Sequence, residues 1–179
     1  MGETVGLAVV GAGYWGPNMI RNAAETPGAE LRMVCDLDED RLRKAGRRNP
    51  GARLTRDLDE VLADPSVDAV ILATPAASHH ALGKRVLQAG KDVLVEKPLA
   101  MSTAEARELV AVADAGKRVL MAGHTFIYNA AVRYVRDLVV SGEIGEVLYI
   151  YSSRANLGQV RKDVNALWNV APHDISIAN

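Results

Sequence analysis

Two short groups of residues carry the side chains best suited to acid–base chemistry. Lys97 stands between Glu96 and Pro98, directly after a short apolar run, and an ammonium at the end of a buried strand can polarise or protonate a substrate oxygen. His173 lies near the end of the sequence, and imidazole titrates near neutral pH, which suits a general acid or base. The motifs alone leave two alternatives open: a solvated loop lysine at 97 and a structural residue of a helix N-terminus at 173.

The other histidines are weaker candidates. His79 and His80 are adjacent on an expected helix and therefore point in different directions, which makes them poor joint ligands for a metal. His79 either faces a cofactor or serves in capping and packing, and His124 is expected to be structural. No cysteine pair or histidine–acid cluster has the spacing of a metal site, so we expect no metal.

A glycine-rich turn near the N-terminus offers a site for phosphate. Residues 5–10 form an apolar run typical of a strand buried on both faces of a parallel sheet, and GAGYWG at residues 11–16 matches G-x-G-x-x-G. The first glycine permits the tight turn, the second lets a pyrophosphate approach, and the third lets the next helix pack closely. The positive end of that helix then faces the phosphates, although an ordinary strand–helix turn is the alternative. The candidate cofactor contacts in this turn are Gly11, Gly13, Tyr14, Trp15 and Gly16.

Asp36 follows the next expected strand, 25 residues after Gly11. At this place in a dinucleotide-binding unit, a carboxylate accepts hydrogen bonds from the adenosine ribose. It also repels a 2′-phosphate, because like charges about 4 Å apart cost about 4 kcal/mol at an effective dielectric constant of about 20. That cost outweighs help from Arg41 or Arg43, so we expect NAD rather than NADP. The alternative is that Asp36 only caps the following helix.

The elements around these residues alternate between strands and helices. Strands are expected at 5–10, 30–35, 67–73, 92–95 and 118–122, and the last is counted as the sixth strand. Helices are expected at 14–26, 37–48 and 76–89, with shorter or later ones opened by capping boxes at 57–60 and 102–105. This pattern predicts an α/β fold with a Rossmann-type doubly wound parallel sheet, ordered 3-2-1-4-5-6. The ligand should cross the carboxyl ends of the strands, near Gly11, Asp36, Thr74 and Glu96.

The pattern changes after Gly123, so we divide the chain into residues 1–123, a dinucleotide-binding domain, and residues 124–179. In the second part we expect a helix at 129–140, a strand at 145–152 and a helix that begins at Pro172. Two Ala-Gly-Lys corners, at 89–91 and 115–117, are interpreted as helix C-caps. Because the last helix starts so close to Asn179, we expect the chain to be the N-terminal portion of a longer protein.

Composition excludes several classes of function. The 179 residues are 49% hydrophobic and 24% charged, with a net charge of −1, which gives no electrostatic case for binding nucleic acid or a membrane surface. No signal peptide or membrane-spanning run is expected. The single cysteine, Cys35, lies in an expected strand and is interpreted as a packing residue in a reducing compartment, so we expect a cytoplasmic protein.

Together these pieces resemble the glucose–fructose oxidoreductase/inositol dehydrogenase (Gfo/Idh/MocA) family. The matching segments are GAGYWG at 11–16, ATPAASHH at 73–80, VEKPLA at 95–100, GHTF at 123–126 and SGEIGEV at 141–147. Residues 13–22 and 154–177 look most like members that act on nucleotide-linked sugars, such as UDP-N-acetylglucosaminuronate 3-dehydrogenases and the 3-ketoreductases of deoxysugar pathways.

The resemblance implies oxidation of a sugar carbinol, or reduction of the ketone, with hydride exchanged at the nicotinamide of NAD. Lys97 would be the catalytic lysine and His173 the acid/base histidine. Beside Asp36, the residues lining the cofactor would be Thr74, Pro75, His79, Glu96 and Lys97. Those on the substrate side would be Lys97, Arg154, Asn156, Arg161, Asn169 and His173.

The sequence departs from the family pattern in two ways. Asn169 stands where many members have an aspartate, four residues before the histidine; an asparagine can orient an imidazole but cannot stabilise its charge. Family members are also roughly twice as long, with a C-terminal α/β domain for substrate binding and homo-oligomer formation, of which residues 124–179 would be the beginning. The alternatives are a non-catalytic NAD(H)-binding module, or a chain that self-associates through an exposed strand edge.

Overall fold

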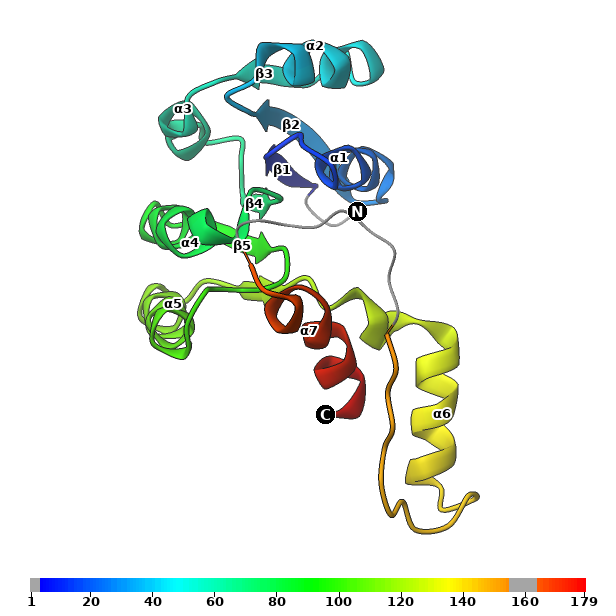
Figure 1. Cartoon of the computed structure of the whole chain (residues 1–179). Coiled ribbons are helices and arrows are strands. Elements are labelled where there is room, and N and C mark those ends of the chain that lie inside the picture. Colours follow the sequence, from blue (N-terminus) through cyan, green and yellow to red (C-terminus); the bar gives the residue numbers. More distant parts are fainter. Residues whose placement is uncertain (1–3, 155–163) are drawn as a thin grey trace. The chain divides into compact units, whose positions relative to one another are not determined.

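Six parallel strands form one sheet in the order β3-β2-β1-β4-β5-β6 (Figure 1). The strands are β1 (Val5–Val10), β2 (Ala29–Cys35), β3 (Arg53–Thr55), β4 (Ala69–Leu72), β5 (Asp92–Val95) and β6 (Leu120–Ala122). With helices between them, they make a Rossmann-type α/β fold. The fold class and the strand order predicted from the sequence are therefore confirmed.

The computed structural model describes residues 4–154 and 164–179. By its internal contacts the chain divides into two units, Met1–Ala122 and Gly123–Asn179. The sheet and its helices make up the first unit, and each unit is described by itself.

Helices cover both faces of the sheet because successive strand residues point to opposite sides. On one face, Val9, Val34 and Ile71 pack with apolar residues of α1 (Gly16–Glu25) and α2 (Glu39–Arg48). On the other face, their strand neighbours pack against α3 (Leu58–Ala63), α4 (His79–Gln88) and α5 (Thr103–Gly116). A short 3-10 turn, η1 (Ala76–Ser78), precedes α4, so the helix predicted over 76–89 is confirmed with an irregular first turn.

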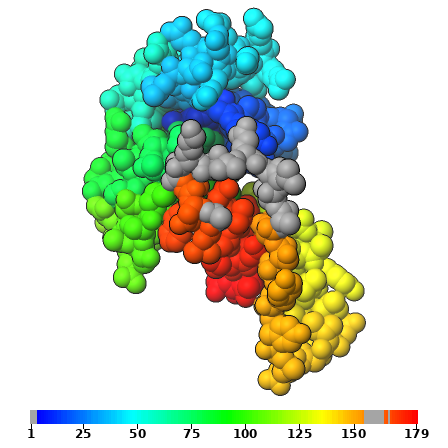
Figure 2. Space-filling view, viewed as in Figure 1, coloured from blue at the N-terminus to red at the C-terminus, as the bar shows by residue number. Residues whose placement is uncertain are grey.

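The edge strand β3 was not located by sequence reasoning. It has only three residues, pairs with β2 through Leu54 opposite Val34, and leaves Arg53 and Leu54 exposed. No apolar run marks such a strand, so its hydrogen bonds to β2 define it. In the space-filling view the cyan segment that holds α2 and β3 forms one edge of the first unit (Figure 2).

The two Ala-Gly-Lys corners end their helices differently. Gly90 takes a left-handed conformation, φ +76°, directly after Ala89, the C-cap of α4, as predicted for a glycine that ends a helix. In the second corner Gly116 remains in α5, and Lys117 takes the left-handed conformation instead, φ 52°. The expected equivalence of the two corners is therefore wrong in detail.

Cys35 closes β2 inside the core. Its side chain packs with Met33 and Val10 beneath α3, and burial together with the neighbouring Asp36 raises the pKa of the thiol to about 11. The thiol is therefore protonated and inert at neutral pH, in keeping with a packing role.

The second unit contains η2 (Thr125–Tyr128), α6 (Ala130–Val140) and α7 (Ala166–Ala178). The helix predicted over 129–140 is confirmed, with Asn129 as its N-cap. The strand predicted over 145–152 is wrong: no described residue pairs with this segment, and Val147, Tyr149 and Tyr151 are exposed. Alternation of side chains gives a strand only when a neighbouring strand supplies hydrogen bonds.

The last helix also differs from the prediction. Asn165 caps α7 by accepting a hydrogen bond from the backbone N–H of Trp168, so the helix begins at Ala166 and Pro172 lies inside it. The cap residue was the signal that the sequence analysis missed, since asparagine is among the preferred N-cap residues. Within the described residues, none of the helices combines the length and the apolar character needed to cross a bilayer.

Candidate functional site

The turn after β1 requires glycine at its first and last motif positions. Gly11 has a φ of +98° and donates its N–H to Cys35 O at 2.8 Å, and a Cβ there would lie 2.6 Å from Ala73 O. A Cβ on Gly16 would lie 2.1 Å from the carbonyl oxygen of Gly11. Both contacts are with backbone, which cannot yield, so the chain can turn from β1 into α1 only with glycines here.

The turn is open at Gly13, where a phosphate would approach. A Cβ on Gly13 would meet only the Arg41 guanidinium, at 3.5 Å. Trp15 occupies the N-cap position of α1, and no side chain caps this helix end. Uncapped amides, the positive end of the helix dipole and a nearby guanidinium together make a cradle for a pyrophosphate.

Asp36 connects the carboxyl end of β2 to the glycine turn. Its carboxylate, 8% exposed, accepts the N–H of Ala12 at Oδ2 (2.6 Å) and the N–H of Asp38 at Oδ1 (2.8 Å). Asp38, not Asp36, is the N-cap of α2, so the alternative that Asp36 caps this helix is wrong. Each carboxylate oxygen keeps a second lone pair, and both can still accept ribose hydroxyls.

The segment after β4 is held by side-chain contacts. Ser78 donates to Pro75 O at 2.7 Å and lies 2.8 Å from the Thr74 hydroxyl. His79 is 1% exposed, and its ring nitrogens lie 2.7 Å from Pro98 O and 2.9 Å from Thr74 O. The His79 ring therefore makes its polar contacts in the interior, between the segment that follows β4 and the segment that follows β5.

Glu96 leaves β5 at the same edge of the sheet. Its carboxyl is held by hydrogen bonds from the Trp15 indole and the Lys97 backbone, while burial raises its pKa above the ordinary value. Oε1 is buried and has no hydrogen-bond partner in the described part of the chain. An orphaned acceptor beside an open glycine turn fits a site that a polar ligand completes.

Lys97 is partly buried and is followed by a cis peptide bond to Pro98. Because β5 runs parallel to β4, β1 and β2, Lys97 lies at the carboxyl ends of the strands, where the glycine turn and Asp36 also lie. In an open α/β sheet, this edge is where ligands bind.

In the second unit, His173 lies in α7 with its ring edge-on to Phe126, with centroids 4.8 Å apart. Arg154 stacks over the same phenyl ring at 5.0 Å and pairs with both carboxylate oxygens of Asp174, at 2.8 and 3.0 Å. The hydrogen bond from Arg154 lowers the pKa of Asp174, and the same contact raises the pKa of Arg154. Asn169 lies one helical turn before His173.

The structure therefore places the predicted cofactor residues at the carboxyl ends of the strands in the first unit, except that His79 is buried in the interior, and it places Arg154, Asn169 and His173 in the second unit. Asn156 and Arg161 lie outside the described residues. Sequence reasoning missed the Trp15–Glu96 contact and the pairing of Arg154 with Asp174, because neither partner is near the other in sequence. Among the described residues, no group of three histidine, cysteine or acidic side chains is placed to hold a metal ion.

Comparisons with known proteins agree with this geometry. Residues 5–124 match the family described as "Oxidoreductase family, NAD-binding Rossmann fold" (GFO_IDH_MocA). Among curated proteins, inositol 2-dehydrogenase 2 of Saccharopolyspora erythraea is 32% identical over 180 residues, which cover 98% of this chain and 53% of the relative. The chain spans about half the length of the curated relatives that it matches, for example 40% of 2,7-anhydro-N-acetylneuraminate hydratase of Mediterraneibacter gnavus.

Solved structures show the same fold. GenD2 from gentamicin A biosynthesis, crystallised with NAD, is 41% identical with a TM-score of 0.76, over 80% of this chain and 41% of that one. A protein from Magnetospirillum magnetotacticum MS-1 is 37% identical with a TM-score of 0.87, over 98% and 56%. A variant of KijD10, a 3-ketoreductase from Actinomadura kijaniata crystallised with TDP-benzene and NADP, is 28% identical with a TM-score of 0.75, over 81% and 46%.

Proposed function

Because the chain belongs to the GFO_IDH_MocA family of NAD-binding Rossmann oxidoreductases, as its motifs predicted, we propose that it forms the cofactor-binding part of a sugar oxidoreductase. The enzyme would transfer hydride between nicotinamide and the carbinol or ketone carbon of a sugar. The observation that carries the proposal is the link between the glycine turn and Asp36, the 2.6 Å hydrogen bond from Ala12 N–H to Oδ2.

The residues present fit NAD. The pyrophosphate would lie over Gly13 at the uncapped start of α1, and Asp36 would bind the adenosine ribose. Thr74, Pro75 and Glu96 would line the remainder of the cofactor, at the ends of β4 and β5. When bound, NAD supplies the hydride acceptor and NADH the donor. The carboxylate of Asp36 favours NAD over NADP, although the similar 3-ketoreductase KijD10 was crystallised with NADP.

Lys97 and His173 would carry the acid–base chemistry. The Lys97 ammonium would hydrogen-bond the oxygen on the reacting carbon and stabilise the negative charge that grows there. His173 would take the carbinol proton during oxidation and return it during reduction. Asn169 would orient the imidazole by a hydrogen bond, whereas the nearby carboxylate of Asp174 is held by Arg154.

We further propose that the sugar is nucleotide-linked. Arginines bind diphosphate and carboxylate groups well, and Arg154, Asn156 and Arg161 would lie on the substrate side. Since Arg154 is already paired with Asp174, an anionic substrate would have to share or replace this carboxylate. The similarity to KijD10, a 3-ketoreductase crystallised with TDP-benzene, supports the same class of substrate.

We assign residues 1–123 to the cofactor domain and 124–179 to the start of a substrate and oligomerisation domain of a full-length homo-oligomer. A second candidate function, a non-catalytic NAD(H)-binding module, needs only the glycine turn and its hydrogen bond to Asp36, both of which lie in the first unit.

Replacing Lys97 by alanine tests the catalytic proposal. Loss of one donor that stabilises the developing charge costs about 10²–10³ in rate, so NADH formation from a panel of UDP- and TDP-linked sugars should fall by that factor. NADH affinity, followed by tryptophan fluorescence, should fall far less, because the glycine turn and Asp36 remain in place. Lys84→Ala is the matched control, because Lys84 is a surface residue of α4 paired with Glu108. NADH binding with no turnover in the wild-type chain would instead favour the binding module.

A further inference from the structure

The two neighbours of the His79 ring have the same hydrogen-bonding character. Nδ1 lies 2.7 Å from Pro98 O and Nε2 lies 2.9 Å from Thr74 O, and both oxygens belong to backbone carbonyls. A carbonyl oxygen can only accept. A neutral imidazole has a single N–H, so it can serve one of these carbonyls but not both.

Burial prevents water from resolving this conflict. The side chain is 1% exposed, so in either neutral tautomer one ring nitrogen would direct its lone pair at a carbonyl oxygen within hydrogen-bond distance. Burial alone disfavours a charged imidazole. Two charge-assisted hydrogen bonds offset that cost, since such bonds are about twice as strong as neutral ones, and only the imidazolium ion makes both.

We propose that His79 is held as a doubly protonated imidazolium and is a positioning residue, which clamps the segment after β4 to the segment after β5. One carbonyl belongs to Thr74 and the other to Pro98, the residue next to Lys97. The clamp would therefore fix the place at which Lys97 enters the site, so its role in function rests on the function proposed above. This role differs from direct contact of His79 with the cofactor.

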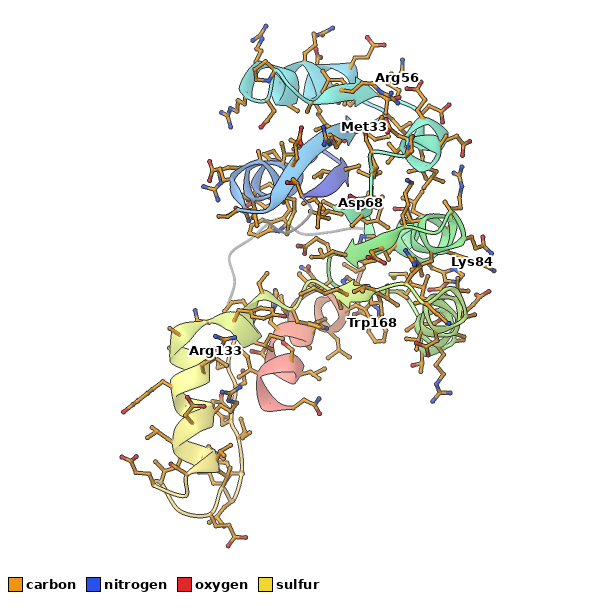
Figure 3. The ribbon with its side chains drawn as sticks, turned by 180° about the vertical axis from the view of Figure 1, so that it is seen from behind. Met33, Arg56, Asp68, Lys84, Arg133 and Trp168 are labelled. Atoms are coloured by element: carbon orange, nitrogen blue, oxygen red, sulfur yellow. The ribbon has the colours of Figure 1, made fainter. Side chains whose placement is uncertain are left out.

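The charged groups around the clamp leave the two carbonyls as its partners. On α4 itself, His80 and Lys84 both pair with Glu108 of α5, and Lys84 extends from the outer side of α4 in Figure 3. Glu105 of α5 accepts the N–H of Met101. After β5 come Glu96, which the Trp15 indole holds, and Lys97; β4 and η1 contain no ionisable side chain.

The protonation state can be measured without a cofactor. In the wild-type chain labelled with ¹⁵N-histidine, at about pH 7.5, where an ordinary histidine is mostly neutral, both ring nitrogens of His79 should show one-bond couplings to a proton. The signals are assigned by loss in His79→Gln, with His80→Gln as the matched control. A single protonated nitrogen in the His79 ring would overturn the proposal. A neutral His79 ring with a purely structural role would show this single protonated nitrogen.

The positioning role is tested by NADH affinity. Glutamine carries no charge and cannot reach both carbonyls as the ring does, so His79→Gln releases the segment of Thr74 and Pro75, which lines the cofactor in the proposed function. We therefore expect His79→Gln to bind NADH about tenfold more weakly, the effect of losing one charge-assisted hydrogen bond. His80→Gln should bind as the wild type does. Wild-type affinity in His79→Gln would overturn the positioning role. If the wild-type chain bound no NADH, the proposed function would fail, while the ¹⁵N experiment would still decide the protonation state.

Discussion

Replacing Asp36 by asparagine removes a negative charge at the ribose end of the candidate site and leaves the shape of the side chain almost unchanged. The Asp36 carboxylate is nearly buried and holds two backbone N–H groups, from Ala12 at 2.6 Å and Asp38 at 2.8 Å. Asparagine keeps one acceptor oxygen for one of these groups. Its amide nitrogen then faces the other N–H, so we expect a loss of about 1–3 kcal/mol in the free energy of unfolding.

The effect on cofactor choice follows from charge. A 2′-phosphate about 4 Å from the carboxylate would cost about 4 kcal/mol at an effective dielectric constant of about 20. Solvent screening at the edge of the sheet reduces this repulsion energy. Even a repulsion of about 1.4 kcal/mol corresponds to a tenfold change in affinity. Asp36→Asn should therefore bind NADPH at least about tenfold more tightly than the wild type does, and Arg41, which lies 3.9 Å from Asp36 and 3.3 Å from Asp38, supplies a cation beside the phosphate.

Fluorescence titration with NADH and NADPH measures this change, and the ratio of the two dissociation constants removes any common effect of altered stability. Asp40→Asn is the matched control, because it removes the same charge from an exposed carboxylate of α2 that pairs with Arg43 and not with Arg41. An unchanged ratio in Asp36→Asn, or an equal shift in Asp40→Asn, would refute the assignment of Asp36 to the ribose.

Two further substitutions test the turn and the rim. Gly16→Ala places a Cβ 2.1 Å from the Gly11 carbonyl oxygen, so urea denaturation should show a loss of about 3 kcal/mol in the free energy of unfolding, the upper range for overpacking. In the control Gly51→Ala the Cβ meets nothing within 4 Å, so the free energy of unfolding should change by less than about 0.5 kcal/mol. Similar losses in the two variants would contradict the clash at Gly16. Burial raises the pKa of Glu96 above 4.5, so the folded chain binds this proton more tightly than the unfolded chain, and the wild type loses stability as pH rises from 4.5 through the pKa of the folded state. Glu96→Gln removes that loss, so its stability relative to the wild type should increase with pH over this interval, whereas parallel curves would show that the carboxyl is not perturbed.

The fold was predictable wherever local pattern and tertiary structure agree. The buried strands and the glycine turn follow from apolar runs and a motif, and the strand order follows from the general winding of alternating strands and helices, although β3 itself was not located. Leu54 of β3 and the segment 145–152 show the limit: the first is a strand because β2 pairs with it, and the second is not one because no described segment does. Strand pairing depends on two segments, so the pattern of one segment alone can fail to predict a real strand and can also predict a strand that does not form.

The site was predictable by motif, but its contacts were not. The sequence indicates where Asp36, Glu96 and His79 stand relative to the strands. It does not show that the Trp15 indole reaches Glu96, or that two carbonyls enclose the His79 ring, since these contacts depend on how distant turns fold together. Trp15 lies within the recognised glycine motif, which was the only available signal.

The buried thiol of Cys35 gives this chain an internal reporter. Since the sequence has no other cysteine, any thiol-specific reagent has a single target, and that target lies beneath α3 at the end of β2. Modification must wait until this part of the sheet opens. The labelling rate of the native protein therefore records how often β2 separates from its covering helix, and a dinucleotide that bridges the β1 turn and Asp36 would slow that opening in proportion to its occupancy.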